Sequence, residues 1–387
     1  MQGEIYMKVV IAIDSFKGSI SSIDAGNAVQ RGVLSACPDA ETRVFPVADG
    51  GEGTVDAIVA ALAGEYIETE TVDPLGRKMC AVYGIVGDTA VIEMSAAAGL
   101  PLLTEEERDP MKTTTYGVGL MIRDALSRGC RRFIVGIGGS ATNDGGIGML
   151  QALGFGILDE NGDPVPYGAR GVEKVARITA DNADPALKNA VFSVACDVTN
   201  PLCGEAGCSA VFSPQKGARP DDIPLMDAWL SRYAAKVKAV FPDADETASG
   251  AGAAGGIGFA FRSFLSARTE KGVELVLGAI GFDIAVKDAD LVITGEGRLD
   301  GQSVMGKTPV GVARAAKKNG ATVVALSGCV EPSASACHEH GIDAYFPILD
   351  RARPLSEAMD KEVTQANLAR TAEEAMRLLL IAKRAKD

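Results

Sequence analysis

Histidine is nearly absent from the sequence. The two histidines, His338 and His340, stand together in the segment Cys337-His338-Glu339-His340. A hydrolase of the Ser-His-Asp or Cys-His type needs a histidine base beside its nucleophile, so one histidine-bearing turn gives that class little support. The four residues also resemble metal ligands, but no second ligand cluster stands near them in the sequence. We therefore interpret the segment as a surface turn.

Long apolar segments and clustered cysteines are missing as well. No apolar run reaches the roughly 18 residues that a membrane-spanning helix requires. The first residues, MQGEIYMKVV, lack the basic and then apolar pattern of a signal peptide. The eight cysteines are spread over 387 residues, which is typical of reduced thiols. We therefore expect a cytoplasmic protein with no membrane partner.

The sequence has fewer basic than acidic residues. Lys and Arg total 38, Asp and Glu total 51, and the net charge is −13. An acidic surface repels nucleic acid and anionic lipid, so we expect neither as a partner. An anionic substrate would need a locally basic pocket.

What the sequence does contain is a regular alternation of short β-branched segments and amphipathic helical ones at both ends of the chain. Strands are predicted over 8–13, 291–294, 321–327 and 344–348, and a helix over 21–36. This alternation predicts an α/β fold in which both chain ends build one parallel sheet.

The middle of the chain differs, because it is rich in glycine turns over 136–148 and 250–258. Since 387 residues exceed the usual ~100–200 of one domain, we predict two. Residues 7–73 plus 288–387 are expected to form a Rossmann-like parallel-sheet domain, and residues 74–287 a second α/β domain inserted into it.

Polar segments follow the first strands of this pattern. Asp14-Ser15-Phe16-Lys17-Gly18-Ser19 comes directly after the strand 8–13, where open α/β sheets bind ligands, and its lysine suits phosphate or carboxylate oxygens. In 49–54, two carboxylates stand among three glycines and could hold Mg²⁺ or accept a hydroxyl proton. Capped structural turns explain both segments as well.

The densest ligand-like segment is 136–146, with bare backbone, two hydroxyls, an amide and a carboxylate. Successive amides of such a loop form an anion-binding nest. Its Gly136-x-Gly138-x-x-Ala141 spacing also fits a dinucleotide fingerprint, which keeps an NAD-dependent hydroxy-acid dehydrogenase as an alternative. That fingerprint normally continues straight into a helix, whereas Asn-Asp-Gly-Gly follows here.

Residues 301–308 match the Walker A pattern letter for letter. A P-loop needs a strand that runs into its first glycine, and we expect the strand to end near Thr294, so we interpret the match as accidental. Lys307, at an expected helix start, is still well placed for a phosphate.

Two further segments lie in the middle of the chain. Asp197 follows a predicted strand over 191–195 and, three residues before Asn200, forms either an Asx-type turn or a base with an orienting amide. The segment 250–258 has no reactive side chain, and we leave open whether it packs backbone closely or approaches a nucleotide.

Seven segments, taken in order, resemble the signature blocks of the bacterial glycerate kinase family that forms 2-phosphoglycerate. They are SFKGS (15–19), ADGGEGT (48–54), GGSATNDGG (138–146), NPLCG (200–204), PQKGA (214–218), SGAGAAGGIGFA (249–260) and TGEGRLDGQSVMGKTP (294–309). Each block alone is weakly specific, but seven in order are strongly specific. The resemblance runs from about residue 8 to the C-terminus.

The resemblance implies an ATP-dependent kinase that phosphorylates D-glycerate to 2-phosphoglycerate, with ATP and Mg²⁺ as cofactors and the active site in a cleft between two α/β domains. Phosphorylation at O3, giving 3-phosphoglycerate, stays open, as does a homodimer. A non-catalytic ligand-binding regulator would explain the glycine loops but not six motif carboxylates beside four motif cations.

We assign roles on this basis. Asp197 is predicted to be the base for the attacking hydroxyl, with Asp49 second, and Lys17 and Arg298 are predicted to contact phosphate and carboxylate groups. The predicted ATP contacts are Ser15, Gly18, Gly138, Gly139, Ser140, Thr142, Asn143, Lys216, Gly297 and Lys307. The predicted Mg²⁺ ligands are Glu52, Asp144, Glu296 and Asp300.

Overall fold

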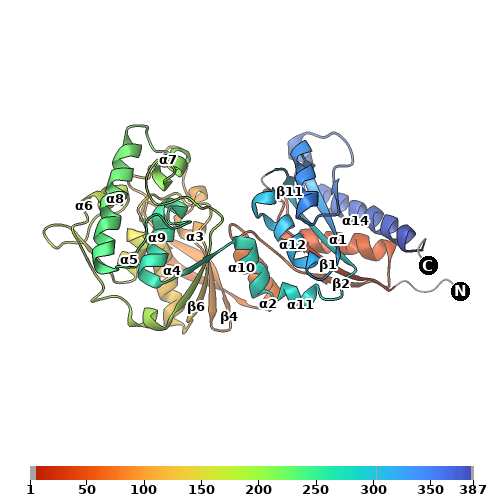
Figure 1. The fold of residues 1–387 in the computed structure, drawn as a ribbon, viewed down its shortest axis with the longest axis horizontal. Helices are drawn as coiled ribbons and strands as arrows, with labels where there is room; N and C mark the ends of the chain where they lie inside the picture. The colour runs from red at the N-terminus through yellow and green to blue at the C-terminus, as the bar shows by residue number, and fades with distance from the viewer. Residues whose placement is uncertain (1–5, 302, 385–387) are drawn as a thin grey trace. The chain divides into compact units, whose positions relative to one another are not determined.

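The computed structural model describes residues 6–301 and 303–384 (Figure 1). The chain divides into two compact units: unit 1 lies within 1–49, 56–62 and 273–387, and unit 2 within 50–55 and 63–272. The predicted boundaries near 73 and 288 differ from this division by about ten to fifteen residues. The main reason is strand β3 (Glu65–Val72), which pairs along its whole length with a strand of unit 2.

Unit 1 is built on a five-stranded parallel sheet of order β13-β12-β11-β1-β2. The strands are β1 (Lys8–Ile13), β2 (Glu41–Val44), β11 (Leu291–Leu299), β12 (Thr322–Val330) and β13 (Ala344–Pro347). The central strand β1 pairs in parallel with β11 on one side and with β2 on the other. Red and blue segments therefore lie side by side in Figure 1, which confirms the parallel sheet predicted from both chain ends.

One face of this sheet is covered by helices α1 (Ser22–Ala36) and α14 (Lys361–Arg384). The Ser21 hydroxyl caps α1 by accepting a hydrogen bond from the Asp24 amide at 3.2 Å, the interaction that makes serine a favoured N-cap residue. The two helices approach closely at Gly32, where a β-carbon would lie 2.0 Å from the Ala369 carbonyl oxygen. Helix α12 (Thr308–Lys317) contacts β11 and β12. The remaining helical segments assigned wholly or mainly to this unit are α2 (Thr54–Leu62), α10 (Gly272–Ala279), α11 (Phe282–Ala285), η4 (Ser303–Met305), η5 (Pro332–His340) and α13 (Leu355–Ala358).

Strand β11 is longer than predicted. The expected strand over 291–294 is too short, because β11 continues to Leu299 and pairs with β12 as far as Arg298–Cys329 and Leu299–Val330. Residues 295–298 are glycines and charged residues, which are rare in strands, so a search for apolar, β-branched residues does not find this part of β11. Glycine is required at position 295, since a β-carbon there would lie 2.0 Å from the Leu326 carbonyl oxygen of the neighbouring strand.

Unit 2 contains a six-stranded sheet of order β10-β9-β6-β5-β4-β3. Its first four strands in this order are parallel and the last two pair antiparallel. Besides β3, the strands are β4 (Lys78–Val86), β5 (Thr89–Glu93), β6 (Arg132–Gly136), β9 (Val191–Ala195) and β10 (Arg268–Glu270), and a hairpin of β7 (Gly156–Leu158) and β8 (Arg177–Thr179) stands apart from the sheet.

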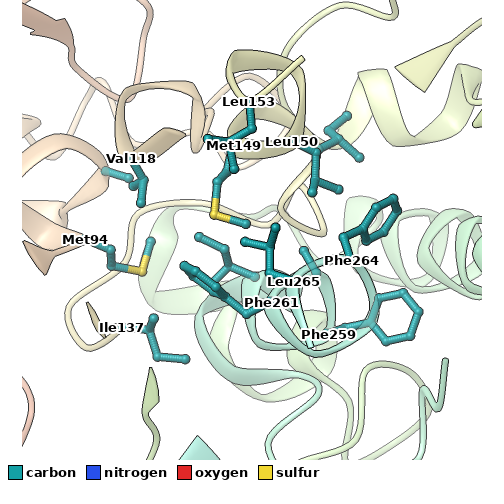
Figure 2. Close-up of a cluster of buried hydrophobic side chains, with 14 of the residues drawn as sticks. Met94, Val118, Ile137, Met149, Leu150, Leu153, Phe259, Phe261, Phe264 and Leu265 are labelled. Atoms are coloured by element: carbon teal, nitrogen blue, oxygen red, sulfur yellow. The ribbon is translucent and has the colours of Figure 1, made fainter. Parts of the chain in front are cut away.

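Helices of unit 2 surround an apolar core. Figure 2 shows Met149 and Leu150 of one helix opposite Phe261 and Leu265 of another. The helical segments are α3 (Ser95–Ala98), η1 (Leu100–Leu102), α4 (Tyr116–Ser127), α5 (Ile147–Ala152), α6 (Ala169–Lys174), η2 (Pro185–Asn189), α7 (Cys208–Phe212), η3 (Pro214–Lys216), α8 (Asp222–Val240) and α9 (Ala253–Leu265). Among the described helices, none is both long enough and apolar enough to cross a membrane.

The glycine-rich segment 250–258 packs backbone against backbone. Within α9, Gly255 and Gly256 have φ of 71° and 92°, a region that favours glycine. A β-carbon on Gly255 would lie 2.0 Å from the Thr142 carbonyl oxygen, and the Gly145 amide donates to the Gly255 carbonyl at 2.9 Å. Of the two interpretations left open from sequence, this geometry supports close packing.

Asp144 organises the loop that this packing supports. The carboxylate is fully buried and accepts hydrogen bonds from the Thr115 amide and hydroxyl, both at 2.9 Å, and from the amides of Gly146 at 3.0 Å and Gly148 at 3.4 Å. Burial raises the pKa of this carboxyl, while the hydrogen bonds oppose the shift. Four donors on one carboxylate fix the loop in front of α5.

We predict that Asp144→Asn lowers the free energy of unfolding by about 3 kcal/mol, because the amide leaves buried donors without an acceptor. Chemical denaturation of the purified protein measures the change. Asp181→Asn, at an exposed position of the same unit, is the matched control and should change little. An Asp144→Asn protein as stable as this control would contradict the role given to the carboxylate.

Candidate active site

A cavity of about 550 Å³ lies in unit 1, at the carboxyl ends of β1 and β12 and beside the second half of β11. Ligands of open α/β sheets bind at this edge. The walls bring together seven residues that the sequence predicted as functional, from four separate chain segments: Ser15, Lys17, Asp49, Glu296, Gly297, Arg298 and Lys307.

Asp14 is the first residue after β1 and lines the cavity although it is only 5% exposed. Its carboxylate accepts a hydrogen bond from the Thr308 hydroxyl at 2.6 Å and another from the Ser15 amide at 2.7 Å. Burial, and next the negative charge of Asp49, raise the pKa of Asp14 to about 6. The sequence analysis gave this residue no role.

Glu296 is a second carboxyl in an unusual environment. It lies within β11 and accepts a hydrogen bond from the Ser303 hydroxyl at 2.6 Å. Burial raises the pKa of Glu296 to about 7, although the Ser303 hydrogen bond and the charge of Lys307 act in the opposite direction. A pocket with carboxyls of raised pKa is a candidate functional site.

Four cations line the same cavity: Lys17, Arg298, Lys307 and Arg353, the last paired with Asp350 at 2.7 Å. Lys17 is exposed, and no ion-pair partner for it is found in the described part of the chain. Lys307 occupies the N-cap position of α12, where the helix dipole favours anions. Arg298 forms ion pairs with Glu331 and, at 3.5 Å, with Asp300. Two lysines are therefore available to an anion, whereas Arg298 must first exchange its partners.

Apolar side chains also line the cavity. Phe16, Ile348, Leu349, Leu355 and Met359 line it, so an occupant with both a charged and an apolar part suits the site.

The Walker-like segment lies between β11 and α12. The ground on which it was judged accidental is wrong, because β11 ends at Leu299, directly before the segment, and not near Thr294. The amide of Gly301, its first residue, nevertheless donates to the Ser333 hydroxyl at 3.0 Å, and the amide of the preceding Asp300 donates to the Ser303 hydroxyl at 3.2 Å. Amides engaged in this way do not form the nest of a P-loop.

In unit 2 the predicted nucleotide loop is mostly internal. Gly138 and Gly139 are exposed, whereas Ser140 is buried and Thr142 and Asn143 are fully buried. The Asn143 amide donates to the Ser209 hydroxyl at 2.9 Å. Only the tip of the loop is therefore open to a ligand in this arrangement. Since α5 begins at Ile147, the strand-to-helix turn of a dinucleotide fingerprint is also absent here.

Lys216 lies beneath this loop and is 1% exposed. Its ammonium donates to the Ser140 hydroxyl at 2.8 Å and to the Thr142 carbonyl at 2.7 Å. Burial lowers the pKa of Lys216 to about 8. The side chain holds the loop from inside, so a direct phosphate contact of the kind predicted has no support in this arrangement.

The remaining predicted residues of unit 2 are Asp197, which is exposed and accepts a hydrogen bond from the Gly272 amide at 3.0 Å, and Glu52, which is exposed. The Asp144 carboxylate accepts the four hydrogen bonds described above, and this arrangement does not support a role as a metal ligand. Within residues 6–301 and 303–384, no three His, Cys, Asp or Glu side chains gather to hold a metal ion.

The sequence analysis missed Asp14 and Thr308. The signal for Asp14 was its position as the first residue after a buried strand. Thr308 was noticed only as part of the Walker match, and its link to Asp14, 294 residues away, is a tertiary contact.

Comparisons with known proteins show which family the chain belongs to. A model described as the glycerate kinase family matches residues 9–380. The chain is 46% identical over 375 residues to a protein named glycerate kinase from Haemophilus influenzae, covering 96% of this chain and 99% of that protein. It is also 46% identical over 354 residues to a protein named glycerate 2-kinase from Escherichia coli K12, covering 91% of this chain and 93% of that protein.

A solved structure extends the likeness to three dimensions. The crystal structure of a candidate glycerate kinase 2 from Salmonella typhimurium LT2 has a TM-score of 0.90 at 42% identity and covers 98% of this chain and 100% of that chain. Family model, relatives and structure all span nearly the whole chain. The chain is therefore a kinase and belongs to the glycerate kinase family.

Proposed function

We propose that this protein transfers the γ-phosphoryl group of ATP to the 2-hydroxyl of D-glycerate, giving 2-phosphoglycerate, with Mg²⁺ bound beside the phosphates. The observation that carries the proposal is the unit 1 cavity, which is lined by cations and carboxyls from separate chain segments together with apolar side chains. The name of the Escherichia coli relative, glycerate 2-kinase, favours O2 over O3. A cytoplasmic location and the active site between two domains stay predictions.

The cations of the cavity are assigned to the anionic groups. Phosphoryl transfer depends on positioning and on neutralising charge, and the chain as a whole is acidic. Lys17 and Lys307 are proposed to contact the phosphates. Arg298 is proposed to bind the glycerate carboxylate, since a guanidinium makes paired hydrogen bonds with a carboxylate, and it would leave Glu331 and Asp300 to do so.

The carboxyls of the cavity fit Mg²⁺. This ion keeps several waters and binds through one or two carboxylates plus substrate phosphates, so the lack of a preformed three-ligand cluster among the described residues agrees with it. Glu296, which lines the cavity, is proposed to help hold the ion, whose positive charge would stabilise the phosphates. Asp300, which pairs with Arg298, stays a predicted ligand. Glu52 stays a prediction.

Asp197 is proposed as the base for the attacking hydroxyl, with Asp49 second. Its carboxylate is exposed at the carboxyl end of β9 and is oriented by the Gly272 amide. These features suit a group that must reach a substrate proton.

With ATP, Mg²⁺ and D-glycerate, the purified protein should form a product that enolase consumes directly, because enolase acts on 2-phosphoglycerate. A product consumed only after phosphoglycerate mutase is added would place the phosphate on O3. Turnover of another hydroxy acid, with none of D-glycerate, would overturn the substrate. Chelation of the metal should abolish turnover.

Lys17→Met should lower kcat/KM about a hundredfold, because a cation aimed at developing phosphate charge is lost. Steady-state kinetics with D-glycerate and ATP varied in turn measure the effect. The matched control is Lys318→Met, an exposed lysine after α12, which should behave as wild type. Equal kinetics for the two variants would remove Lys17 from the site.

Asp197→Asn should lower kcat by about a hundredfold or more if Asp197 takes the hydroxyl proton. The substitution keeps an oxygen that accepts from the Gly272 amide, so folding should be preserved, and a melting curve checks this. Asp181→Asn serves again as the exposed control. A loss below tenfold would assign the base to another residue, and Asp49→Asn would be measured next.

A further inference from the structure

We propose that Asp14 is a further ligand, beside Glu296, of the divalent cation that enters the unit 1 cavity with the nucleotide phosphates, and that Asp49 is a ligand of the same ion, a role that would remove Asp49 as the alternative base. The inference rests on the proposed function, since it assumes a metal-bound triphosphate. It gives a role to a residue that lies outside the predicted site.

The topology of the sheet places both carboxyls at one edge. Asp14 directly follows β1, and Asp49 lies five residues beyond β2, the parallel neighbour of β1. Both line the same cavity, and the charge of Asp49 is close enough to act on Asp14. Two carboxylates at one sheet edge are the protein contribution that Mg²⁺ uses beside substrate phosphates.

The Asp14 carboxylate is held in one orientation. One oxygen accepts from the Ser15 amide at 2.7 Å and the other from the Thr308 hydroxyl at 2.6 Å. An ionised carboxylate has about four acceptor sites, so each oxygen keeps capacity for a further partner. Carboxylates that bind metals are commonly fixed by such outer hydrogen bonds.

The two hydrogen bonds do not explain why position 14 carries a charged carboxylate and not a neutral side chain. An asparagine would form both bonds, because its oxygen accepts from the Ser15 amide and its NH₂ group donates to the Thr308 hydroxyl. The carboxylate is 5% exposed, has a like charge beside it, and forms no ion pair within the described residues. Burying such a charge is costly, and a divalent cation would relieve both burial and repulsion.

The test is the affinity for Mn²⁺, read by electron paramagnetic resonance, for the full-length protein with a non-hydrolysable ATP analogue. Asp14→Asn should weaken Mn²⁺ binding at least tenfold while the melting temperature is unchanged or higher. Asp39→Asn, at an exposed turn of the same unit, should bind Mn²⁺ as wild type. Thr308→Val, which removes only the orienting hydroxyl, should weaken binding less than Asp14→Asn.

Less than fivefold weakening by Asp14→Asn would overturn the inference, as would an equal loss in Thr308→Val, which would make Asp14 a positioning residue. If Asp14→Asn does not fold, Asp49→Asn decides by the same criterion. Wild-type protein that binds no Mn²⁺ with the ATP analogue would instead overturn the proposed function. Since no turnover is measured, an error in the acceptor substrate leaves this test intact.

Discussion

The parallel pairing of β1 with β11 is the interaction on which the site of unit 1 depends. The two strands come from opposite ends of the chain, and their register, with Ile13 beside Gly295, brings Asp14 and Glu296 to the same sheet edge. The hydrogen bond from Thr308 to Asp14 then ties the start of α12 to the end of β1. Without this pairing, the cations and carboxyls of the cavity would have no common surface.

Buried charge recurs in both units, with different consequences. In unit 1, Asp14 is buried and Glu296 is half-buried, and both line a cavity close to other carboxyls. In unit 2, Asp144 and Lys216 are buried and form hydrogen bonds that hold the glycine-rich loop 136–146. Asp14 and Glu296 therefore face a cavity that a ligand can enter, whereas Asp144 and Lys216 stabilise the protein's own backbone.

Predictions from sequence were good where local pattern suffices. Strand 8–13 was found with its observed bounds, and the helix predicted over 21–36 starts one residue before the observed α1 because its pattern is local. The second half of β11 was missed. Its residues 295–298 are glycines and charged residues, and they form a strand because they pair with β12. The internal hydrogen bonds of Lys216 could not be predicted, because a lysine in a glycine-rich motif suggests an anion and only the tertiary structure shows that this side chain is buried.

By itself, the sequence determined the α/β class, the parallel sheet built from both chain ends, and membership of the glycerate kinase family, because these depend on periodicity and on motifs in order. Only the tertiary structure decided which motif residues face a cavity and which are interior supports. The physical reason is that burial and like-charge proximity arise between residues far apart in sequence, such as Asp14 and Thr308. The same charged side chain serves as ligand or as scaffold according to what packs around it.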